Sequence, residues 1–263
     1  MTSYKHIMRC CWILAVSSSL AVVGCQNSET KDASTGAGVT DVAPRDIDVA
    51  ATGGQPPADA TASQQLALAP LPIILPAPAF RGTPKPLDEP NVEEPLGKPR
   101  PPFLAPDGAA NLALGRRVST SDPAPSAGEL DFVTDGTKEA SDFGYLELRP
   151  GAEWVQIDLG NRSTVYAVLV WHNHADARVY RDVIVQVSDD PDFLTAHTVF
   201  NNDYDNSSGL GIGFDMGYVE TSEGKLIDCK GVEARYVRLF TNGNHIDDKN
   251  HFTEVEVFGG PEA

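Results

Sequence analysis

Short runs of alternating apolar and polar residues fill the C-terminal part of the chain. Alternation with a period of two is typical of β-strands with one buried face, and the Gly, Asn and Asp residues between the runs favour turns. No run keeps a period of 3.6 residues over the length of a helix. The pattern predicts a single all-β sandwich or barrel of roughly 150 residues. The runs are EWVQIDLG (153–160), STVYAVLVW (163–171), RDVIVQVSDD (181–190), AHTVFNND (196–203), GKLIDC (224–229), ARYVRLFTNG (234–243) and FTEVEVFGG (252–260).

Residues 26–108 lack either period and contain 15 of the 20 prolines. The stretch LALAPLPIILPAPAF (66–80) is apolar, but its prolines argue against a stable helix or a central strand. We therefore predict a disordered tether over 25–108, which as a flexible coil would span roughly 50 Å. A docking role for the apolar stretch is the alternative.

The N-terminus has the features of an export signal. Lys5 and Arg9 precede the apolar run CCWILAVSSSLAVV, which is too short for a membrane span. The sequence Val-Val-Gly-Cys that ends at Cys25 resembles the lipobox of bacterial lipoproteins. We expect a signal peptide over 1–24, lipidation of Cys25 and an address at the cell envelope, with the outer membrane favoured because Gln26 follows the cysteine.

Charge and cysteine content narrow the classes of ligand. The chain carries a formal charge of −17, and residues 109–263 account for −14 of it, with 26 acidic and 12 basic residues. Such a domain repels nucleic acid and anionic lipid, whereas neutral sugars or cations suit it better. If Cys10 and Cys11 leave with the signal and Cys25 is lipidated, Cys229 has no disulfide partner in the chain, and we expect it to serve packing.

The order of the motifs resembles a known family. NLALGRRVSTSD (111–122), DFVTDGT (131–137), WVQIDLG (154–160), VIVQVSDD (183–190), ARYVRLF (234–240) and TEVEVFG (253–259) follow one another as in the discoidin, or coagulation-factor 5/8 type C, family of galactose-binding-like domains. The resemblance covers 109–260. It implies an eight-stranded jelly-roll β-sandwich that binds ligands through loops at one end and is not an enzyme.

The resemblance also implies a structural calcium ion. Bacterial members bind it with an Asp before Gly, a Thr five residues later and a Glu in the last strand. Asp135, which precedes Gly136, and Glu254 match the two carboxylates, and calcium prefers six to eight oxygen ligands of this kind. Ala140 stands at the threonine position, where Ser141 is the nearest substitute. A metal-free loop closed by hydrogen bonds, as in animal members, is the alternative.

The stretch WHNHADARVYRD (171–182) carries the densest polar chemistry. Sugar-binding relatives hold hydroxyls with His, Arg and Asn from loops and stack a ring on the sugar. The candidate ligand contacts are His172, Asn173, His174, Arg178 and Tyr180, with Asn242, Asn244 and His245 from the loop after YVRLF. The alternative is that the aromatic residues belong to the core and the arginines pair with neighbouring aspartates.

Other chemistry finds less support in the sequence. The pair His172 and His174 lacks the following glutamate of a cupin metal site, and no helix follows it as in an HNH nuclease. No serine lies in a GxSxG motif. Two carboxylates could still meet in space for glycoside hydrolysis.

The segment 201–224 is an insertion rich in Asp, Asn and Gly. Asp203, Asp205 and Ser207 begin like a calcium loop, but Ser208 and Phe214 occupy the positions where an EF-hand needs Gly and Glu. A surface loop, a mobile rim of the binding face and a second weak cation site remain as interpretations.

The sequence thus predicts a non-catalytic, lipid-anchored binding module whose ligand is a surface or matrix carbohydrate. The alternative is a module that docks an envelope protein without binding sugar. Nothing in the sequence calls for an oligomer.

Overall fold

The fold is almost entirely β-structure, as the sequence predicts. The computed structural model describes residues 67–81, 89–140 and 143–261, all within the compact unit Thr61–Ala263. In these ranges the only helix is the short 3-10 helix η1 (Leu130–Thr134), and none is long and apolar enough to cross a bilayer. The strands are β1 (Leu68–Pro70), β2 (Leu104–Pro106), β3 (Ala110–Asn111), β4 (Val118–Thr120), β5 (Leu146–Leu148), β6 (Glu153–Trp171), β7 (Ile184–Ser188), β8 (His197–Asn201), β9 (Lys225–Thr241), β10 (Asn250–Phe252) and β11 (Glu254–Pro261).

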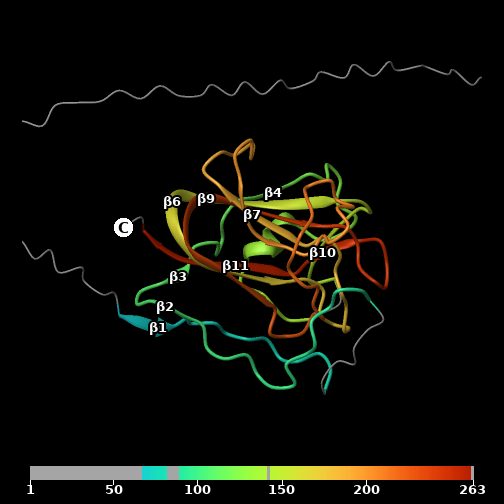
Figure 1. Ribbon diagram of the computed structural model, residues 1–263, viewed down its shortest axis with the longest axis horizontal. Coiled ribbons are helices and arrows are strands. Elements are labelled where there is room, and N and C mark those ends of the chain that lie inside the picture. Colours follow the sequence, from blue (N-terminus) through green and yellow to red (C-terminus); the bar gives the residue numbers. More distant parts are fainter. Residues whose placement is uncertain (1–66, 82–88, 141–142, 262–263) are drawn as a thin grey trace, which may run out of the picture. The chain divides into compact units, whose positions relative to one another are not determined.

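Two long strands build both layers of a β-sandwich (Figure 1). β6 and β9 pair antiparallel, with a register shift between Asp158 and Ser163 where the ribbon bends over. One layer holds β4, the first half of β6, the second half of β9, β7 and β8. The other holds β3, β11, the second half of β6 and the first half of β9. The sandwich class is confirmed, although one seven-stranded sheet supplies both layers.

The space between the layers is filled by the apolar positions of the alternating runs. Val155 and Ile157 from the first half of β6 and Val168 and Val170 from its second half are fully buried in one cluster. Valines of β7, β9 and β11 join them, and burial of such side chains is the main driving force for this fold.

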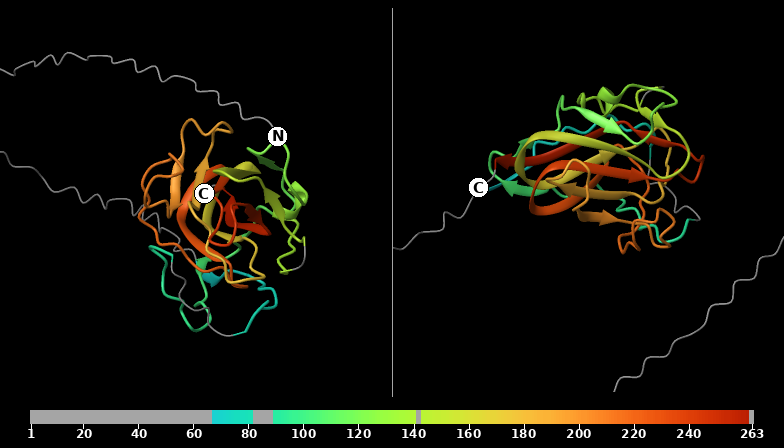
Figure 2. Two further views of the ribbon diagram at one scale, coloured as in Figure 1. Left: turned by 90° about the vertical axis from the view of Figure 1, so that its right-hand side faces the viewer. Right: turned by 90° about the horizontal axis from the view of Figure 1, so that it is seen from above.

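The outer face of the second layer is covered as well. Leu169 and Trp171 point away from the inner core into a second buried cluster with Leu71, Ala105 and Phe258. β1 and β2 pair antiparallel beside it, and the residues around them run along one side of the sandwich (Figures 1 and 2).

The prediction of a disordered tether up to residue 108 is therefore wrong for 67–81 and 89–108, which pack on the sandwich. Proline spacing ruled out a central strand but not a short edge strand and an extended cover. The signal peptide, Cys25 and residues 26–66 lie outside the described residues.

The long loops gather at one end of the sandwich, opposite the bends of β6 and β9 (Figure 1). Asn250 links two of them: its Oδ1 accepts a hydrogen bond from the Gly243 amide at 2.7 Å, and its Nδ2 donates to the carbonyls of Arg149 and Gly151. These are the loops in which the resemblance places the ligand-binding residues.

Candidate functional site

Most of the predicted ligand contacts are internal. His172 and His174 have no exposed surface, and Asn173, Tyr180 and Asn244 are 7%, 1% and 2% exposed. A ligand at the surface cannot reach side chains this deep without opening the loops. The prediction that these five residues contact a ligand is at odds with their burial, and their residue types gave no sign of it.

A buried polar chain accounts for two of the predicted residues. His172 Nδ1 lies 2.5 Å from Glu220 Oε1, and the imidazole stacks on Tyr180 with ring centroids 4.3 Å apart. The Tyr180 hydroxyl meets His251 Nδ1 at 2.8 Å, and His251 Nε2 lies 3.3 Å from Glu147. Burial, with Glu220 adding to it, raises the pKa of Tyr180 well above its usual value. Each of these side chains makes at least one hydrogen bond, as buried polar groups usually do, but His172 Nε2 and Glu220 Oε2 are buried without a partner among the described residues.

Four of the other residues, Arg178, Asn242, Asn244 and His245, hold the two predicted loops together. Arg178 donates to Asp247 at 2.8 Å and to Asn244 at 3.3 Å. His245 Nδ1 accepts a hydrogen bond from the Val179 amide at 3.0 Å, and Asn242 donates to Asp182 at 2.8 Å. The loops do meet in space, but the side chains expected to bind ligand bind each other. Arg178, Asn242 and His245 are partly exposed, and for them ligand contact stays a prediction.

The two predicted calcium ligands, Asp135 and Glu254, are 119 positions apart in the chain but lie close together in space. The Gly136 amide donates to Glu254 Oε2 at 3.1 Å, while Glu254 Oε1 is buried and has no hydrogen-bond partner among the described residues. Burial raises the pKa of Glu254 to about 9, and the negative charges of Glu256 and Asp135 add to this. A buried, unpartnered carboxylate oxygen close to a second carboxylate fits a cation. Ala140 adds no side-chain oxygen, and Ser141 lies outside the described residues.

A second group of carboxylates lies where the insertion meets the loop after Trp171. Among the described residues, Asp182, Asp203 and Asp205 form the one group of three metal-ligating side chains with ligand atoms within 4.8 Å of one another. The chain already supplies donors to it: Ser207 Oγ donates to Asp182 at 2.7 Å, and the Ser207 amide donates to Asp203 and Asp205. A weak cation site here stays one of the three interpretations of the insertion.

Cys229 is a packing residue in this fold. It is 4% exposed within the inner core, and burial raises the pKa of its thiol to about 12. A thiol of this kind is a poor nucleophile.

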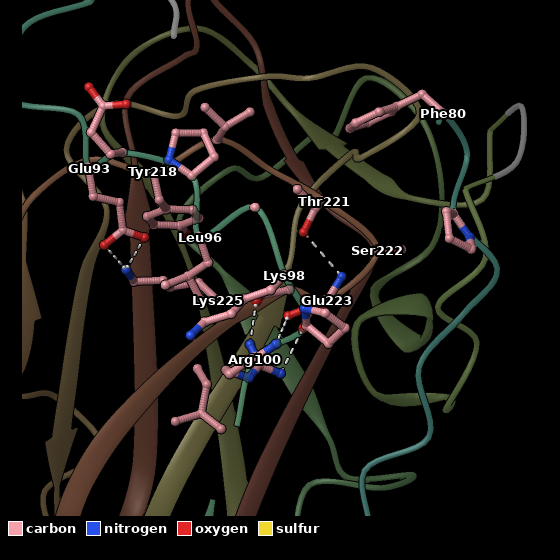
Figure 3. A pocket seen from close by; sticks show the side chains of 18 of the residues that line it. Phe80, Glu93, Leu96, Lys98, Arg100, Tyr218, Thr221, Ser222, Glu223 and Lys225 are labelled. Atoms are coloured by element: carbon pink, nitrogen blue, oxygen red, sulfur yellow. Dashed lines mark hydrogen bonds and ion pairs between the residues drawn. The ribbon is translucent and has the colours of Figure 1, made fainter. Parts of the chain in front are cut away.

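A pocket in the described part of the chain lies elsewhere, between the N-terminal segment and the insertion (Figure 3). We call it the strap pocket. Its volume is about 720 Å³, in the range of small-molecule sites. It is lined by residues 78–81 and 93–100 and by residues 218, 219 and 221–226.

Arg100 fixes the two walls of the strap pocket to each other. Its guanidinium donates to the carbonyl oxygens of Gly224 at 2.8 Å and Glu223 at 2.9 Å, and its amide donates to Glu223 Oε2 at 3.0 Å. On the other side of the pocket, Lys225 Nζ donates to the two carboxylate oxygens of Glu93 at 2.9 and 3.0 Å (Figure 3). Five hydrogen bonds between segments more than a hundred residues apart give the pocket a defined shape.

The turn at the floor of the strap pocket rests on the sandwich. Trp171 Nε1 donates to the Ser222 carbonyl at 3.0 Å, and Gly224 lies against the Trp171 ring. Thr221 Oγ1 accepts from the Glu223 amide at 3.2 Å, and its carbonyl accepts from the Gly224 amide at 3.1 Å. The floor is therefore pre-formed rather than shaped by a ligand.

The strap pocket combines rings with polar groups. Phe80 is half-buried, and it lies apart from Glu93 and Tyr218 on the other side of the pocket (Figure 3). The Lys225 ammonium lies 4.8 Å from the centre of the Tyr218 ring. Sequence reasoning missed this site because its walls come from the presumed tether and from the insertion.

No family model matches the chain, and no curated protein does. Solved structures similar to it include a truncated AlyQ with CBM32 and alginate lyase domains, at 22% identity and a TM-score of 0.42 over 56% of this chain, which spans about a third (33%) of that chain. A chitosan-binding module 1 of a chitosanase/glucanase from Paenibacillus sp. IK-5 is 21% identical, with a TM-score of 0.43 over 57% of this chain and 99% of that one. The lectin binding domain of Lectinolysin, complexed with Lewis b, is 19% identical, with a TM-score of 0.40 over 59% and 97% of the two chains.

Proposed function

We propose that this protein is a non-catalytic carbohydrate-binding module and that its sugar occupies the strap pocket. A lipid on Cys25, after removal of residues 1–24, holds it at the bacterial cell envelope, with the outer membrane favoured. Residues 26–66 serve as the tether, and the binding unit begins by residue 67. A calcium ion held by Asp135 and Glu254 stabilises the domain.

The observation that carries the proposal is the make-up of the strap pocket. Sugar rings have apolar C–H faces and polar edges, so a protein site needs an aromatic or aliphatic surface beside hydrogen-bonding groups. Phe80 and Leu96 supply the first, and Lys98, Thr221 and Ser222 line the same pocket. The fixed walls reduce the ordering cost of binding.

The loop end offers less for a sugar. Of the eight residues expected there, five are buried, and Arg178, although partly exposed, is engaged by Asp247. The strap pocket is open to solvent, and its Leu96 is 63% exposed. We therefore place the ligand in the strap pocket and not in the loop 171–182.

A glycan-array screen of the full chain, with and without calcium, tests the proposal. Phe80→Ala removes one of the two aromatic rings of the strap pocket, and Ile246→Ala is the comparable truncation at the loop end, where the side chain is 52% exposed. Binding that is lost in Phe80→Ala and kept in Ile246→Ala is the expected result. Loss in Ile246→Ala alone would move the site to the loop end, and a folded protein that binds no glycan would overturn the proposal.

One observation favours the alternative of a protein-docking module. Leu210, Ile212, Phe214 and Met216 on the insertion are 42%, 61%, 95% and 48% exposed. Exposed apolar side chains that gather on one segment are typical of interaction surfaces. Co-purification of an envelope protein that is lost on Phe214→Ser, without any glycan binding, would favour this function.

A further inference from the structure

We infer that the strap pocket is selective for acidic saccharides, with the carboxylate of a uronic-acid unit held by Arg81 and Lys98 while a sugar ring packs on Phe80. The inference rests on the proposed function and names its ligand class. It revises the expectation of a neutral sugar, which came from the charge of the whole domain.

The net charge of the residues that line the strap pocket is positive, whereas the net charge of the domain is negative. Seven charged residues line the pocket, of which four are basic and three acidic, whereas residues 109–263 carry −14. The basic ones are Arg81, Lys98, Arg100 and Lys225, and the acidic ones are Glu93, Glu94 and Glu223.

The contacts in the walls divide the basic residues into two kinds. Arg100 is committed to Glu223 and Gly224, and Lys225 is committed to Glu93. Arg81 and Lys98 are exposed, and neither side chain forms a hydrogen bond or ion pair with the described residues, 67–81, 89–140 and 143–261. Two cations that the described structure leaves available can therefore meet an anion at the pocket.

The negative charge of the domain does not prevent this. At physiological ionic strength, charges separated by more than roughly 8 Å are largely screened, so local contacts decide the affinity. A carboxylate within hydrogen-bonding distance of a guanidinium or an ammonium makes a charge-assisted contact, which is about twice as strong as a neutral one. A neutral sugar would leave both cations without a new partner.

Pairs of oligosaccharides that differ only in the carboxylate separate the two ligand classes. We would titrate the full chain with short oligogalacturonates, oligomannuronates and oligoglucuronates, each beside its carboxyl-reduced counterpart, and measure the heat of binding. At least one uronate should bind, with an affinity at least about tenfold higher than its reduced form, and the difference should shrink as salt is added.

Two double variants test the assignment to residues. Arg81→Gln with Lys98→Gln removes the two cations, and Arg117→Gln with Lys230→Gln makes the same change of charge at exposed positions outside the strap pocket. The first should lower the affinity for the uronate about tenfold or more and leave the reduced sugar unaffected. The second double variant should change the affinity for neither the uronate nor the reduced sugar by more than about twofold.

The failures of the two proposals are distinguishable. Equal or tighter binding of the reduced sugars, lost in Phe80→Ala, would overturn acid selectivity and leave carbohydrate binding in place. Uronate binding that falls equally in both double variants would show a general charge effect and overturn the assignment to Arg81 and Lys98. No binding of either form by the folded protein would overturn both proposals.

Discussion

Trp171 and Gly224 are in direct contact, and this contact connects the core of the sandwich to the strap pocket. The Trp171 indole is fully buried at the end of β6, and it supports the turn that Gly224 closes with a φ of +61°. A Cβ built on Gly224 would lie 2.6 Å from Trp171 Cε2. The pocket floor therefore depends on a residue whose indole faces away from the inner core.

This contact makes Gly224→Ala a sensitive change. The added methyl must displace the indole or the turn, since packed interiors have little free space. We expect a loss of about 2–4 kcal/mol in the free energy of unfolding, measured by urea denaturation. Gly209→Ala is the matched control, because Gly209 also has a positive φ (+76°) but nothing within 4 Å of its Cβ position. A loss no larger than in the control would mean that the indole moves aside freely.

Leu71→Ala tests whether the N-terminal segment is part of the folded domain. Leu71 is 8% exposed in the cluster around Trp171, so its truncation should lower the free energy of unfolding by about 2–3 kcal/mol. Leu75→Ala, in the same segment but 47% exposed, should change it by less than about 0.5 kcal/mol. Equal effects in thermal or urea unfolding would contradict the packing of 67–81 on the sheet.

Asp122 should contribute stability that depends on pH. Burial alone would raise the pKa of this carboxyl, but hydrogen bonds from Arg149 and Ala124 outweigh it and lower the pKa below its usual value. The stabilisation is therefore present above the ordinary pKa of an aspartate, near 3.9, and is lost as the pH falls through the lower pKa of the folded state.

Asp122→Asn should cost about 1–3 kcal/mol at neutral pH, with the difference from the unchanged protein shrinking below about pH 4. Urea unfolding at a series of pH values measures this. The exposed Asp248→Asn serves as the control and should show no such convergence. A difference that is constant down to the acid limit would contradict the linkage.

Calcium should stabilise the domain through Glu254. At a calcium concentration a hundredfold above the dissociation constant, the gain is about 2.7 kcal/mol, which raises the thermal midpoint by about 5–10 °C for a domain of this size. Glu254→Gln keeps the shape but removes the charge, and it should abolish the increase. Glu129→Gln, at an exposed position, should keep it. An increase that persists in Glu254→Gln would point to the carboxylates of Asp182, Asp203 and Asp205.

The sequence predicted the sandwich well because its signal is local. In the first half of β6, Val155, Ile157 and Leu159 are almost fully buried while Trp154 and Asp158 next to them are partly exposed, so the alternation follows directly from one buried face. Four predicted runs became two strands, because β6 and β9 continue through the bend where Gly160 adopts a φ of +88°. The shortest strands, such as β3 with two residues, carry too few positions for a period to appear.

The cover on the second layer could have been inferred from one feature. The run AVLVW (167–171) is apolar at every position, which is typical of a strand buried on both faces. Its outward residues require a partner, and the apolar stretch 66–80 was the obvious candidate. A docking role for that stretch is the alternative that the sequence leaves open, but without this link nothing favours it over a disordered tether.

The strap pocket and the burial of His172 could not be predicted in this way. Arg100 and Glu223 are separated by 123 positions, and nothing in either neighbourhood signals the other. By its sequence position His172 resembles a ligand-binding loop residue, but its Nδ1 is hydrogen-bonded to Glu220 from the insertion. Both depend on where the insertion packs, and its Gly- and Asn-rich composition leaves that open.

The antiparallel β1–β2 pair lies where a force that pulls on the preceding chain would act first. A pull applied through the residues before Leu68 would act first on β1, whose register joins Leu68 to Pro106, and then on the stretch that ends at Phe80. The Arg100 and Lys225 contacts would bear the load next. A ligand in the strap pocket would add its own contacts to this seam, so that binding and resistance to tension would rise together.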